Sequence, residues 1–386
     1  MSKDMKLKEK TTKILQISNY YAPENGGIEK IATAISDGLS DNYEMRVICF
    51  TRKGKSSVEY INNVRVIRSG EKLHLNSQQL SFDIVNIIKR ELKNYEPDII
   101  VLHAPNPYLE KITLRYINKD CKLIVYWHSD IVKQKIGKLI FHQLTVALLS
   151  RADRIIATSP NYIDGSEYLS IYRDKCRVIP NCIDDEVIKK NEKVKKLEKE
   201  IKETNASKCI CVAVGRQVPY KGFEYLCKVF AQLSDMYQLY IIGKKDSSSD
   251  AISRLSMNHS NIHILGEVDY DTLRAYLGAM DIFCFSSITK NEAFGIALAE
   301  AMAFGKPSVT FKIQGSGVNY VSIDGITGIE CENKNIVEYK NAIEKLASDD
   351  KLRIEYGNNA RLRVNKLFTY EIFKKNINHC IEDLIN

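Results

Sequence analysis

Two glutamates flank a segment that is rich in alanine and leucine. Glu292 and Glu300 are separated by seven residues in the run EAFGIALAEAMAFGKP. Asn291 or Glu292 is expected to cap a helix that begins near Phe294 or Gly295, which puts Glu300 about two turns along that helix. A carboxylate buried in such an apolar run needs hydrogen-bond donors, and ribose hydroxyls are donors of this kind. The competing interpretation is an alanine-rich helix with capping acids.

Two basic side chains follow one expected strand in the same half of the chain. Arg216 comes directly after Gly215, and Lys221 with Gly222 comes five residues later, at the amino end of the next expected helix. Arginine offers a planar two-pronged fork, lysine offers a point charge, and the helix dipole adds positive potential. The combination predicts a site for a diphosphate, although either cation alone would be an ordinary surface residue.

The first half of the chain has two further candidate sites at strand ends. Gly26 and Gly27 precede an expected helix and could present backbone N–H groups to an anion, although a plain tight turn explains the same letters. His128 follows another expected strand in the segment WHSD (127–130), where it could bond a sugar hydroxyl or stabilise developing charge. A structural histidine is the alternative, and His103 ends the preceding strand in a similar place.

Two further motifs are better explained without a metal or a cofactor. Asp269-Tyr270-Asp271 has the DxD pattern of metal-dependent transferases, but it stands directly before a helical run, where aspartate is the expected cap. The segment GSGVNY (315–320) begins like a GxGxxG dinucleotide fingerprint, but it ends in tyrosine and follows a late strand. We therefore expect no metal site and no nicotinamide or flavin cofactor.

Composition sets limits on the class of protein. The chain has 386 residues, of which 44% are hydrophobic and 27% charged, which suits two medium-sized globular domains. The net charge of +8 is a mild excess of basic residues that does not identify a binding partner, and we expect no binding of nucleic acid. Ten cysteines without a CxxC pair or zinc spacing predict reduced thiols. No run approaches the roughly 18 apolar residues of a spanning helix, so we expect a cytoplasmic protein.

Short β-rich runs alternate with helical stretches on both sides of a charged segment at 189–208. This rhythm predicts an α/β protein with two doubly wound, parallel, Rossmann-like sheets, in domains 1–186 and 187–369. A C-terminal helix at about 370–386 is expected to pack back on the first domain. Ligands bind at the carboxyl ends of such strands, so two facing domains would form a central cleft. The expected strands are 13–19, 45–50, 64–68, 98–103, 122–128, 154–159, 176–181, 209–215, 238–243, 262–266, 281–287, 307–312 and 328–331.

Together these motifs resemble glycosyltransferase family 4, a family of retaining nucleotide-sugar transferases with the GT-B fold. The resemblance rests on four motifs in this order and at these separations, namely GGIE (26–29), HSD (128–130), Arg216 with Lys221-Gly222, and the paired glutamates. It covers nearly the whole chain. One departure is Asn181-Cys182, where the family often has Asn-Gly.

The resemblance implies a role for each candidate residue. Arg216 and Lys221 would bind the donor diphosphate, Glu300 the ribose and Glu292 the donor sugar. His128 would lie near the reactive face of the sugar. The remaining donor-binding residues that it implies are Gly26 and Gly27, which would close over the phosphate, Gly215 beside Arg216, and the Phe294, Gly295 and Ile296 amides near phosphate or sugar.

The implied activity is transfer of a hexose from a nucleoside diphosphate sugar to a hydroxyl, with retention at the anomeric carbon and without a metal. WHSD with IVKQK, and the stretch GSGVNYVSIDGITG, resemble bacterial mannosyl and rhamnosyl transferases that build surface polysaccharides such as O-antigen. A mannose-type donor and a polyprenyl-diphosphate-linked oligosaccharide acceptor are therefore expected. Two alternatives stay open: a non-hydrolysing sugar nucleotide epimerase, and a catalytically silent nucleotide-sugar-binding or scaffold protein.

A basic stretch between residues 111 and 154 suggests where such a protein would meet its acceptor. Lys133, Lys135 and Lys138, called the lysine patch below, are expected to bind the anionic inner face of the plasma membrane reversibly, with Ile136 and Leu139 entering the interface. A merely solvated helix face is the competing interpretation. The sequence predicts no oligomeric state.

Overall fold

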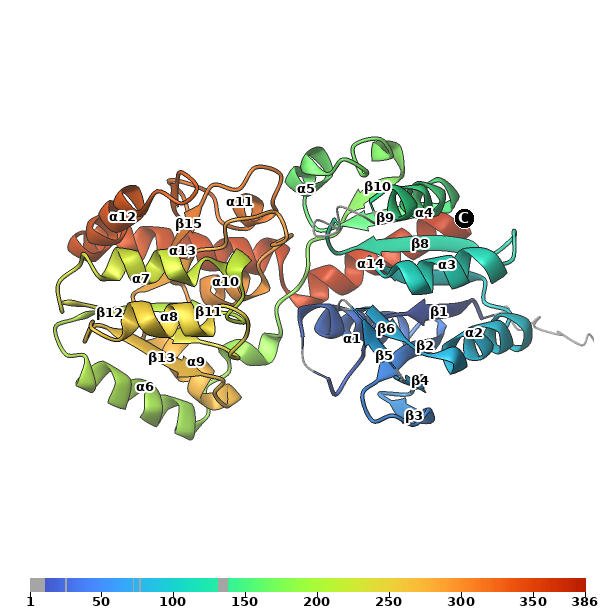
Figure 1. Cartoon of the computed structure of the whole chain (residues 1–386), viewed down its shortest axis with the longest axis horizontal. Coiled ribbons are helices and arrows are strands. Elements are labelled where there is room, and N and C mark those ends of the chain that lie inside the picture. The colour runs from blue at the N-terminus through green and yellow to red at the C-terminus, as the bar shows by residue number, and fades with distance from the viewer. Residues whose placement is uncertain (1–10, 25, 72, 76–77, 131–137) are drawn as a thin grey trace, which may run out of the picture. The chain divides into compact units, whose positions relative to one another are not determined.

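The computed structural model describes residues 11–24, 26–71, 73–75, 78–130 and 138–386, which form two compact units (Figure 1). The first unit comprises Met1–Ala157, Tyr168–Ile179 and Lys374–Asn386, and the second comprises Thr158–Glu167 and Pro180–Phe373. The expected domain limits at 186/187 and 369/370 stay predictions, and so does the expected cleft.

The described part of the first unit is built on an eight-stranded sheet. The strand order is β10-β9-β8-β7-β1-β2-β4-β3, and every neighbouring pair is parallel except β3 with β4. Central strands such as β7, with the sequence IIVLHA, are buried along their whole length because helices cover both faces of such a sheet. The strands are β1 (Lys13–Ile17), β2 (Glu44–Thr51), β3 (Ser57–Ile61), β4 (Val64–Gly70), β7 (Ile99–Ala104), β8 (Lys122–Trp127), β9 (Arg154–Ala157) and β10 (Cys176–Val178).

Helices connect these strands, and one returns from the end of the chain. The connecting helices are α1 (Gly27–Leu39), α2 (Phe82–Asn94), α3 (Pro107–Tyr116) and α4 (Lys138–Arg151). The last helix, α14 (Tyr370–Ile385), lies beside α1, where the Lys374 ammonium pairs with Asp41 at 2.8 Å and the Asn378 amide donates to the carbonyl oxygen of Gly38 at 2.9 Å.

The second unit holds a six-stranded parallel sheet in the order β13-β12-β11-β14-β15-β16. The chain passes from β11 to one side and then returns to add β14 on the other, so the sheet is doubly wound and β11 lies at its switch point. The strands are β11 (Cys209–Val214), β12 (Tyr237–Ile242), β13 (Ile262–Gly266), β14 (Ile282–Phe285), β15 (Ser308–Phe311) and β16 (Gly328–Cys331).

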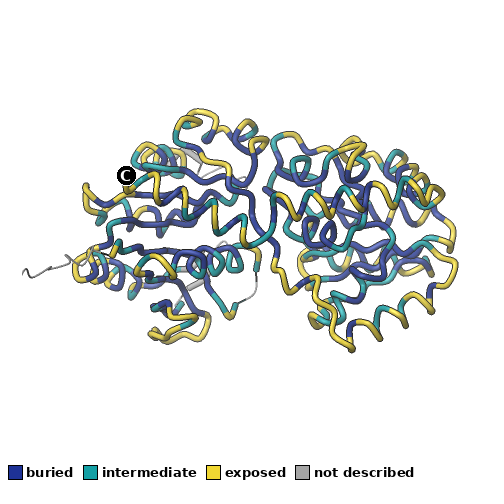
Figure 2. The backbone as a smooth tube through the Cα atoms, turned by 180° about the vertical axis from the view of Figure 1, so that it is seen from behind, coloured by how far each residue is buried: buried dark blue, intermediate teal, exposed yellow. Residues whose placement is uncertain are grey.

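The helices of the second unit complete its layers. They are α5 (Pro160–Gly165), α6 (Glu192–Thr204), α7 (Phe223–Phe230), α8 (Ser249–Ser256), α9 (Tyr270–Ala279), α10 (Ile296–Ala303), α11 (Val318–Val321), α12 (Ile336–Ser348) and α13 (Asp350–Leu367). Figure 2 shows buried backbone gathered inside each unit and exposed backbone at its surface. The fold class that the sequence predicts, two parallel α/β sheets, is confirmed.

Each strand expected from the sequence is present, and the charged segment 189–208 contains α6. The expectations did not include β3, nor the small hairpin of β5 (Leu73–Leu75) and β6 (Gln78–Leu80). All ten cysteines are free thiols. No helix among the described residues is long and apolar enough to cross a membrane.

Candidate active site

A turn that contains glycine positions the two candidate basic residues, Arg216 and Lys221, in the second unit. After β11 the chain passes Gly215 and Arg216, makes a 3-10 turn over Pro219–Lys221, and enters α7 through Gly222. Gly222 has a φ of 66°, and a Cβ there would lie 2.1 Å from the carbonyl oxygen of Ser286 at the end of β14. Only glycine fits this position, so the turn holds Lys221 against the neighbouring strand end.

Lys221 and Glu292 form an ion pair in which each side chain is only 12% exposed. The Ser287 hydroxyl donates to the same Glu292 carboxylate oxygen at 3.0 Å. Burial is the largest single influence and lowers the pKa of the Lys221 ammonium, but the charge and hydrogen bond of Glu292 together with Tyr220 outweigh it, so the net pKa is raised. Lys221 therefore stays a cation near neutral pH, and the structure brings together two residues that lie 71 positions apart in the sequence.

Arg216 lies at the same strand end but is held differently. Its side chain is 63% exposed, and its Nη1 atom lies 3.6 Å from a carboxylate oxygen of Asp246. An exposed pair of this kind is weak, so the guanidinium can move to an anionic ligand at little cost. The positive charge of Arg216 acts to lower the pKa of Lys221, so the two cations act on a common region.

Helix α10 begins later than the sequence predicts. Its N-cap is Gly295, at a φ of 93° and without a side-chain cap, so the prediction that Asn291 or Glu292 caps the helix is wrong. A Cβ at Gly295 would lie 3.1 Å from the ring of Phe285, which favours glycine at this turn. Because Glu292 is not used as a cap, its carboxylate faces Lys221 instead.

The other residues predicted around α10 follow this turn. Phe294 is buried and packs edge-on against the ring of Phe368, 5.3 Å between centroids. Ile296 begins α10, and Glu300 lies inside it with 6% of its surface exposed. Glu300 is thus buried as expected, and its charge is one cause of the raised pKa of Tyr270, after burial and the charge of Asp184. No contact between Glu300 and Lys221 or Arg216 is seen among the described residues.

The sequence alone does not indicate which residues hold the Glu292 loop. Thr158 donates to the carbonyl oxygen of Ala293 at 3.1 Å, and the Gly317 amide donates to the same oxygen at 3.1 Å. A Cβ at Gly317 would lie 2.1 Å from that oxygen. Gly317, one of the glycines that resemble a dinucleotide fingerprint, therefore allows segment 315–320 to pack against this loop.

A buried glutamine was also missed. Gln217 is fully buried, and its amide donates to the carbonyl oxygen of Gly243 at 3.3 Å. Its Oε1 atom has no partner among the described residues. The only signal in the sequence was its place directly after Arg216.

The DxD segment is a helix cap. The Asp269 carboxylate accepts hydrogen bonds from the amides of Asp271 and Thr272 at the start of α9, which confirms the predicted cap. The Thr272 hydroxyl also donates to it, and this bond is the largest cause of a pKa near 2 for Asp269.

In the first unit, α1 begins at Gly27 with Gly26 as its N-cap. Gly26 is extended, with a φ of −173°, so no left-handed backbone requires glycine there. A Cβ at this position would meet only the flexible side chain of Glu29. Asn25 lies outside the described residues, and anion binding by this turn stays a prediction.

His128 and His103 form a pair at the ends of β8 and β7. Nε2 of His128 lies 2.8 Å from Nδ1 of His103, and the rings stack 5.1 Å apart, with Tyr126 beside both. Burial lowers the pKa of His128 to about 3, and burial with the neighbouring His128 ring lowers that of His103 well below its usual value. Both imidazoles are therefore neutral at pH 7.

Comparison with known protein families shows which family the chain belongs to. The family described as Glycosyltransferase Family 4 matches residues 25–187, and the family described as Glycosyl transferases group 1 matches residues 194–363. The chain belongs to glycosyltransferase family 4. It is an enzyme of the glycosyltransferase class, and the resemblance read from the sequence is confirmed.

Relatives and solved structures agree with this assignment. The chain is 29% identical over 361 residues to a D-rhamnosyltransferase of Pseudomonas aeruginosa, covering 92% of each chain. It is 25% identical over 376 residues to the O-antigen chain mannosyltransferase C of Escherichia coli, covering 97% of each. The structure of HepE from Anabaena in complex with UDP superposes with a TM-score of 0.78 at 18% identity, over 96% of this chain and all of that one. This glycosyltransferase therefore has the GT-B fold.

Proposed function

We propose that this enzyme transfers a mannose-type hexose from a nucleoside diphosphate sugar to a hydroxyl of a lipid-linked glycan, with retention at the anomeric carbon. The observation that carries the proposal is the shielded Lys221–Glu292 pair beside the exposed Arg216. A diphosphate can take the place of Glu292 at Lys221 and of Asp246 at Arg216. Glu292 is then released to accept hydrogen bonds from hydroxyl groups of the donor sugar.

The candidate residues of the second unit would act mainly by stabilising the charge that develops as the donor breaks. As the bond from the sugar to the diphosphate breaks, an oxocarbenium-like centre and a growing negative charge form. Lys221 and Arg216 would stabilise that charge, and Glu300, buried in α10, would accept the ribose hydroxyls. The leaving phosphate oxygen would take the proton of the acceptor hydroxyl on the same face, which preserves the anomeric configuration. No residue is assigned as a covalent nucleophile.

The first unit would contribute a neutral hydrogen-bond donor. Nε2 of His103 has no partner among the described residues, and a buried N–H without a partner is rarer than a buried acceptor without one. We therefore place the proton of His103 on Nδ1, from which it donates to Nε2 of His128. His128 then carries its own proton on Nδ1, where it can donate to a sugar hydroxyl.

The donor and acceptor are proposed from the relatives. A D-rhamnosyltransferase and an O-antigen chain mannosyltransferase both align along nearly the whole chain, which supports a mannose-type donor and a role in surface polysaccharide synthesis. The acceptor would be an oligosaccharide on a polyprenyl diphosphate at the inner face of the plasma membrane, and the lysine patch would bring the enzyme to it. Lys133 and Lys135 lie outside the described residues, and Lys138 begins α4.

A donor panel tests the proposal. The purified enzyme would be incubated with GDP-mannose, GDP-D-rhamnose, UDP-glucose and UDP-N-acetylglucosamine, each with and without a polyprenyl-diphosphate-linked oligosaccharide, and products would be followed by mass spectrometry. We expect one GDP-linked donor to give a glycan one hexose longer, and only when the acceptor is present. Conversion of a donor without an acceptor would support an epimerase instead. Binding of donors without any turnover would support a silent nucleotide-sugar-binding protein.

A further inference from the structure

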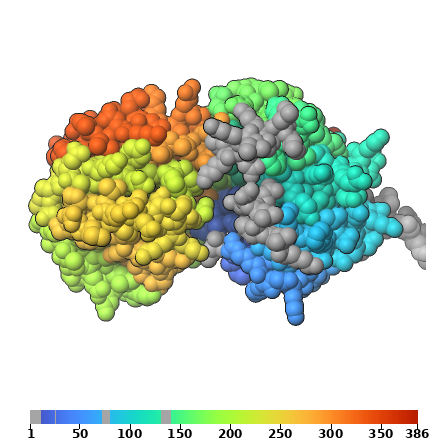
Figure 3. Space-filling view, viewed as in Figure 1, coloured from blue at the N-terminus to red at the C-terminus, as the bar shows by residue number. Residues whose placement is uncertain are grey.

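A hollow of about 450 Å³ lies between α2 and the β3–β4 hairpin of the first unit. This volume falls within the roughly 300 to 1,000 Å³ of small-molecule pockets. Figure 3 shows the hairpin projecting from the surface of this unit. The residues that line the hollow, called the hairpin pocket below, are Ser56, Ser57, Val58, Ile67, Arg68, Asp83, Asn86, Ile87 and Arg90.

The floor of the hairpin pocket is apolar. Ile67 of β4 and Ile87 of α2 are buried and form its inner surface, and Val58 of β3, directly opposite Ile67 across the strand pair, is half exposed beside them. Tyr60 lies two residues further along β3, on the same face, and is 71% exposed. An exposed tyrosine on such a face gives a flat, amphipathic surface next to the hollow.

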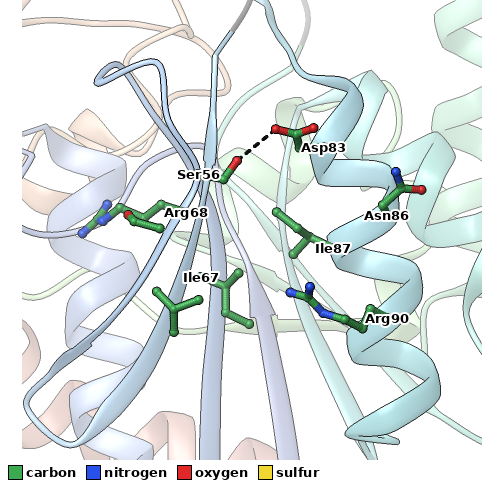
Figure 4. A pocket seen from close by; sticks show the side chains of 9 residues that line it. Ser56, Ile67, Arg68, Asp83, Asn86, Ile87 and Arg90 are labelled. Atoms are coloured by element: carbon green, nitrogen blue, oxygen red, sulfur yellow. Dashed lines mark hydrogen bonds between the residues drawn. The ribbon is translucent and has the colours of Figure 1, made fainter.

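The rim of the hairpin pocket carries hydrogen-bonding groups of both kinds. Figure 4 shows Asp83, Ile87 and Arg90 reaching from α2 toward the strand that carries Ile67. The Ser56 hydroxyl donates to the Asp83 carboxylate at 3.1 Å and so fixes it at the mouth. The Asn86 amide makes no hydrogen bond with any described residue. Arg90 has one ion pair with the described residues, in which its Nε lies 3.5 Å from Glu91.

This combination selects one class of ligand. A carboxylate at the mouth disfavours phosphate and other anions, and a lone arginine beside it disfavours cations. A neutral ligand with many hydroxyl groups can donate to Asp83 and accept from Asn86 and Arg90, while its C–H faces pack on the apolar floor. A sugar residue has this chemistry.

The position of the hairpin pocket fits one particular glycan. Ser56 accepts from the Gly70 amide at the carboxyl end of β4. The end of the pocket at Ser56 therefore lies at the carboxyl ends of the strands, where Gly27 follows β1 and His128 follows β8. In the order β1-β2-β4-β3 the pocket lies two to three strand spacings from β1, roughly 10 to 14 Å. That is the length of a short oligosaccharide.

We propose that the hairpin pocket binds a neutral sugar residue of the acceptor glycan at a distance from the hydroxyl that reacts. The proposal rests on the proposed transfer to a glycan. Arg68 is not part of this recognition, because its guanidinium is buried on the other side of β4, where it donates to the carbonyl oxygen of Ala22 and pairs with Glu59. An enzyme with such a site favours acceptors that already carry several sugar residues.

Two side chains can be removed without disturbing the fold. The Asn86→Ala/Arg90→Ala variant loses the two donors of the rim. Glu91 keeps Arg46 at 2.8 Å and Arg65 at 3.3 Å, so loss of the Arg90 contact leaves it paired. The matched control is Lys93→Ala. Lys93 is an exposed cation of the same helix, and it lines a separate hollow at the amino ends of the strands. Thermal unfolding would confirm that all three proteins are folded.

Direct binding is the first test. Isothermal titration with α-linked mannotetraose and with the corresponding D-rhamnotetraose should show binding of at least one probe to the parent and to Lys93→Ala. Loss of a neutral hydrogen bond from Asn86 and of a stronger one from the charged Arg90 guanidinium predicts binding to the double variant that is weaker by about tenfold or more. Equal binding to the double variant, or no binding of either probe to the parent, would overturn the proposal. So would competition by inorganic phosphate, because it would indicate an anion site.

Transfer kinetics are the second test and separate this proposal from the proposed function. The double variant should raise KM about tenfold for an acceptor with four sugar residues and leave kcat and KM unchanged for an acceptor with one. Equal KM values for parent and variant with the long acceptor would overturn the pocket while leaving transfer intact. If no acceptor is glycosylated but the variant still loses oligosaccharide binding, the pocket stands and the proposed transfer fails.

Discussion

Replacing Glu292 with glutamine should improve nucleotide binding while it slows transfer. In the structure Glu292 neutralises Lys221, so a diphosphate must compete with the carboxylate for this cation. The Glu292→Gln substitution keeps the size of the side chain and the hydrogen bond from Ser287 but removes the competing charge. Lys221→Met, in contrast, removes the cation itself and should weaken both binding and transfer.

The magnitude follows from the exposure of the pair. Exposed ion pairs contribute up to about 1 kcal/mol, and breaking a buried pair costs about 3 to 5 kcal/mol. At 12% exposure on each side we expect a coupling of about 1 to 2 kcal/mol, which is roughly a 5- to 30-fold gain in affinity for the nucleoside diphosphate. Loss of the sugar contact and of charge stabilisation should lower the transfer rate by about 30- to 1,000-fold, which corresponds to about 2 to 4 kcal/mol.

Calorimetric titration with GDP and UDP, together with initial transfer rates, would measure both effects. Glu332→Gln is the matched control, because Glu332 pairs with Lys312 at 3.6 Å in the same unit but is 68% exposed. The reasoning would be refuted if Glu292→Gln bound the diphosphate no more tightly than the parent while Lys221→Met bound it equally well. Lys221 would then not contact the diphosphate.

Four further outcomes are expected. The Glu300→Gln variant should fold normally but bind nucleotide more weakly in calorimetry. The reason is that an amide accepts hydrogen bonds from two ribose hydroxyls less well than a carboxylate does. Unchanged affinity would mean that Glu300 is a core residue only. The pKa values of His103 and His128 are lowered in the folded state, so the unfolded state binds protons more readily than the folded state does. The free energy of unfolding should therefore fall as the pH drops below about 6.5 towards 3. At pH 5.5 the loss should be about 1 kcal/mol per histidine. Urea unfolding at pH 7 and pH 5.5 should show this loss in the parent and less of it in the His103→Asn/His128→Asn variant; an equal loss in both would contradict the assignment. EDTA should leave initial transfer rates unchanged, and a requirement for added Mg²⁺ or Mn²⁺ would contradict this expectation. Changing the lysine patch to glutamate should reduce salt-sensitive co-sedimentation with anionic liposomes, each lysine contributing about 1 kcal/mol, whereas equal pelleting of both proteins would rule the patch out.

The fold was predictable because the hydrophobic pattern is strong. Buried parallel strands such as IIVLHA of β7 and CICVAV of β11 read as apolar runs between helical segments. Strand β3 was missed because it lies at the sheet edge and its sequence SVEYI is exposed on nearly every residue, so it lacks a buried face to give a pattern. The hairpin pocket depends on that strand and was invisible for the same reason.

The site was predictable in its residues but not in their pairing. Lys221 and Glu292 were each identified from a local motif, but their ion pair needs β11 and β14 to be neighbours, and sequence order does not give strand order. The cap of α10 was misplaced because Gly295 adopts a left-handed backbone, whereas acidic residues are the usual caps. His103 lies 25 positions before His128, and only the register of β7 beside β8 brings the two rings together.

The anomeric configuration of the product is the most direct test of the central claim. The enzyme would be given GDP-mannose or GDP-D-rhamnose with an oligosaccharide acceptor, and the new glycosidic linkage would be assigned by NMR while release of GDP is followed in parallel. We predict a linkage of the same anomeric configuration as the donor, formed with one GDP released per sugar and only when acceptor is present. An inverted linkage, or a donor altered at the sugar without any acceptor, would contradict the account.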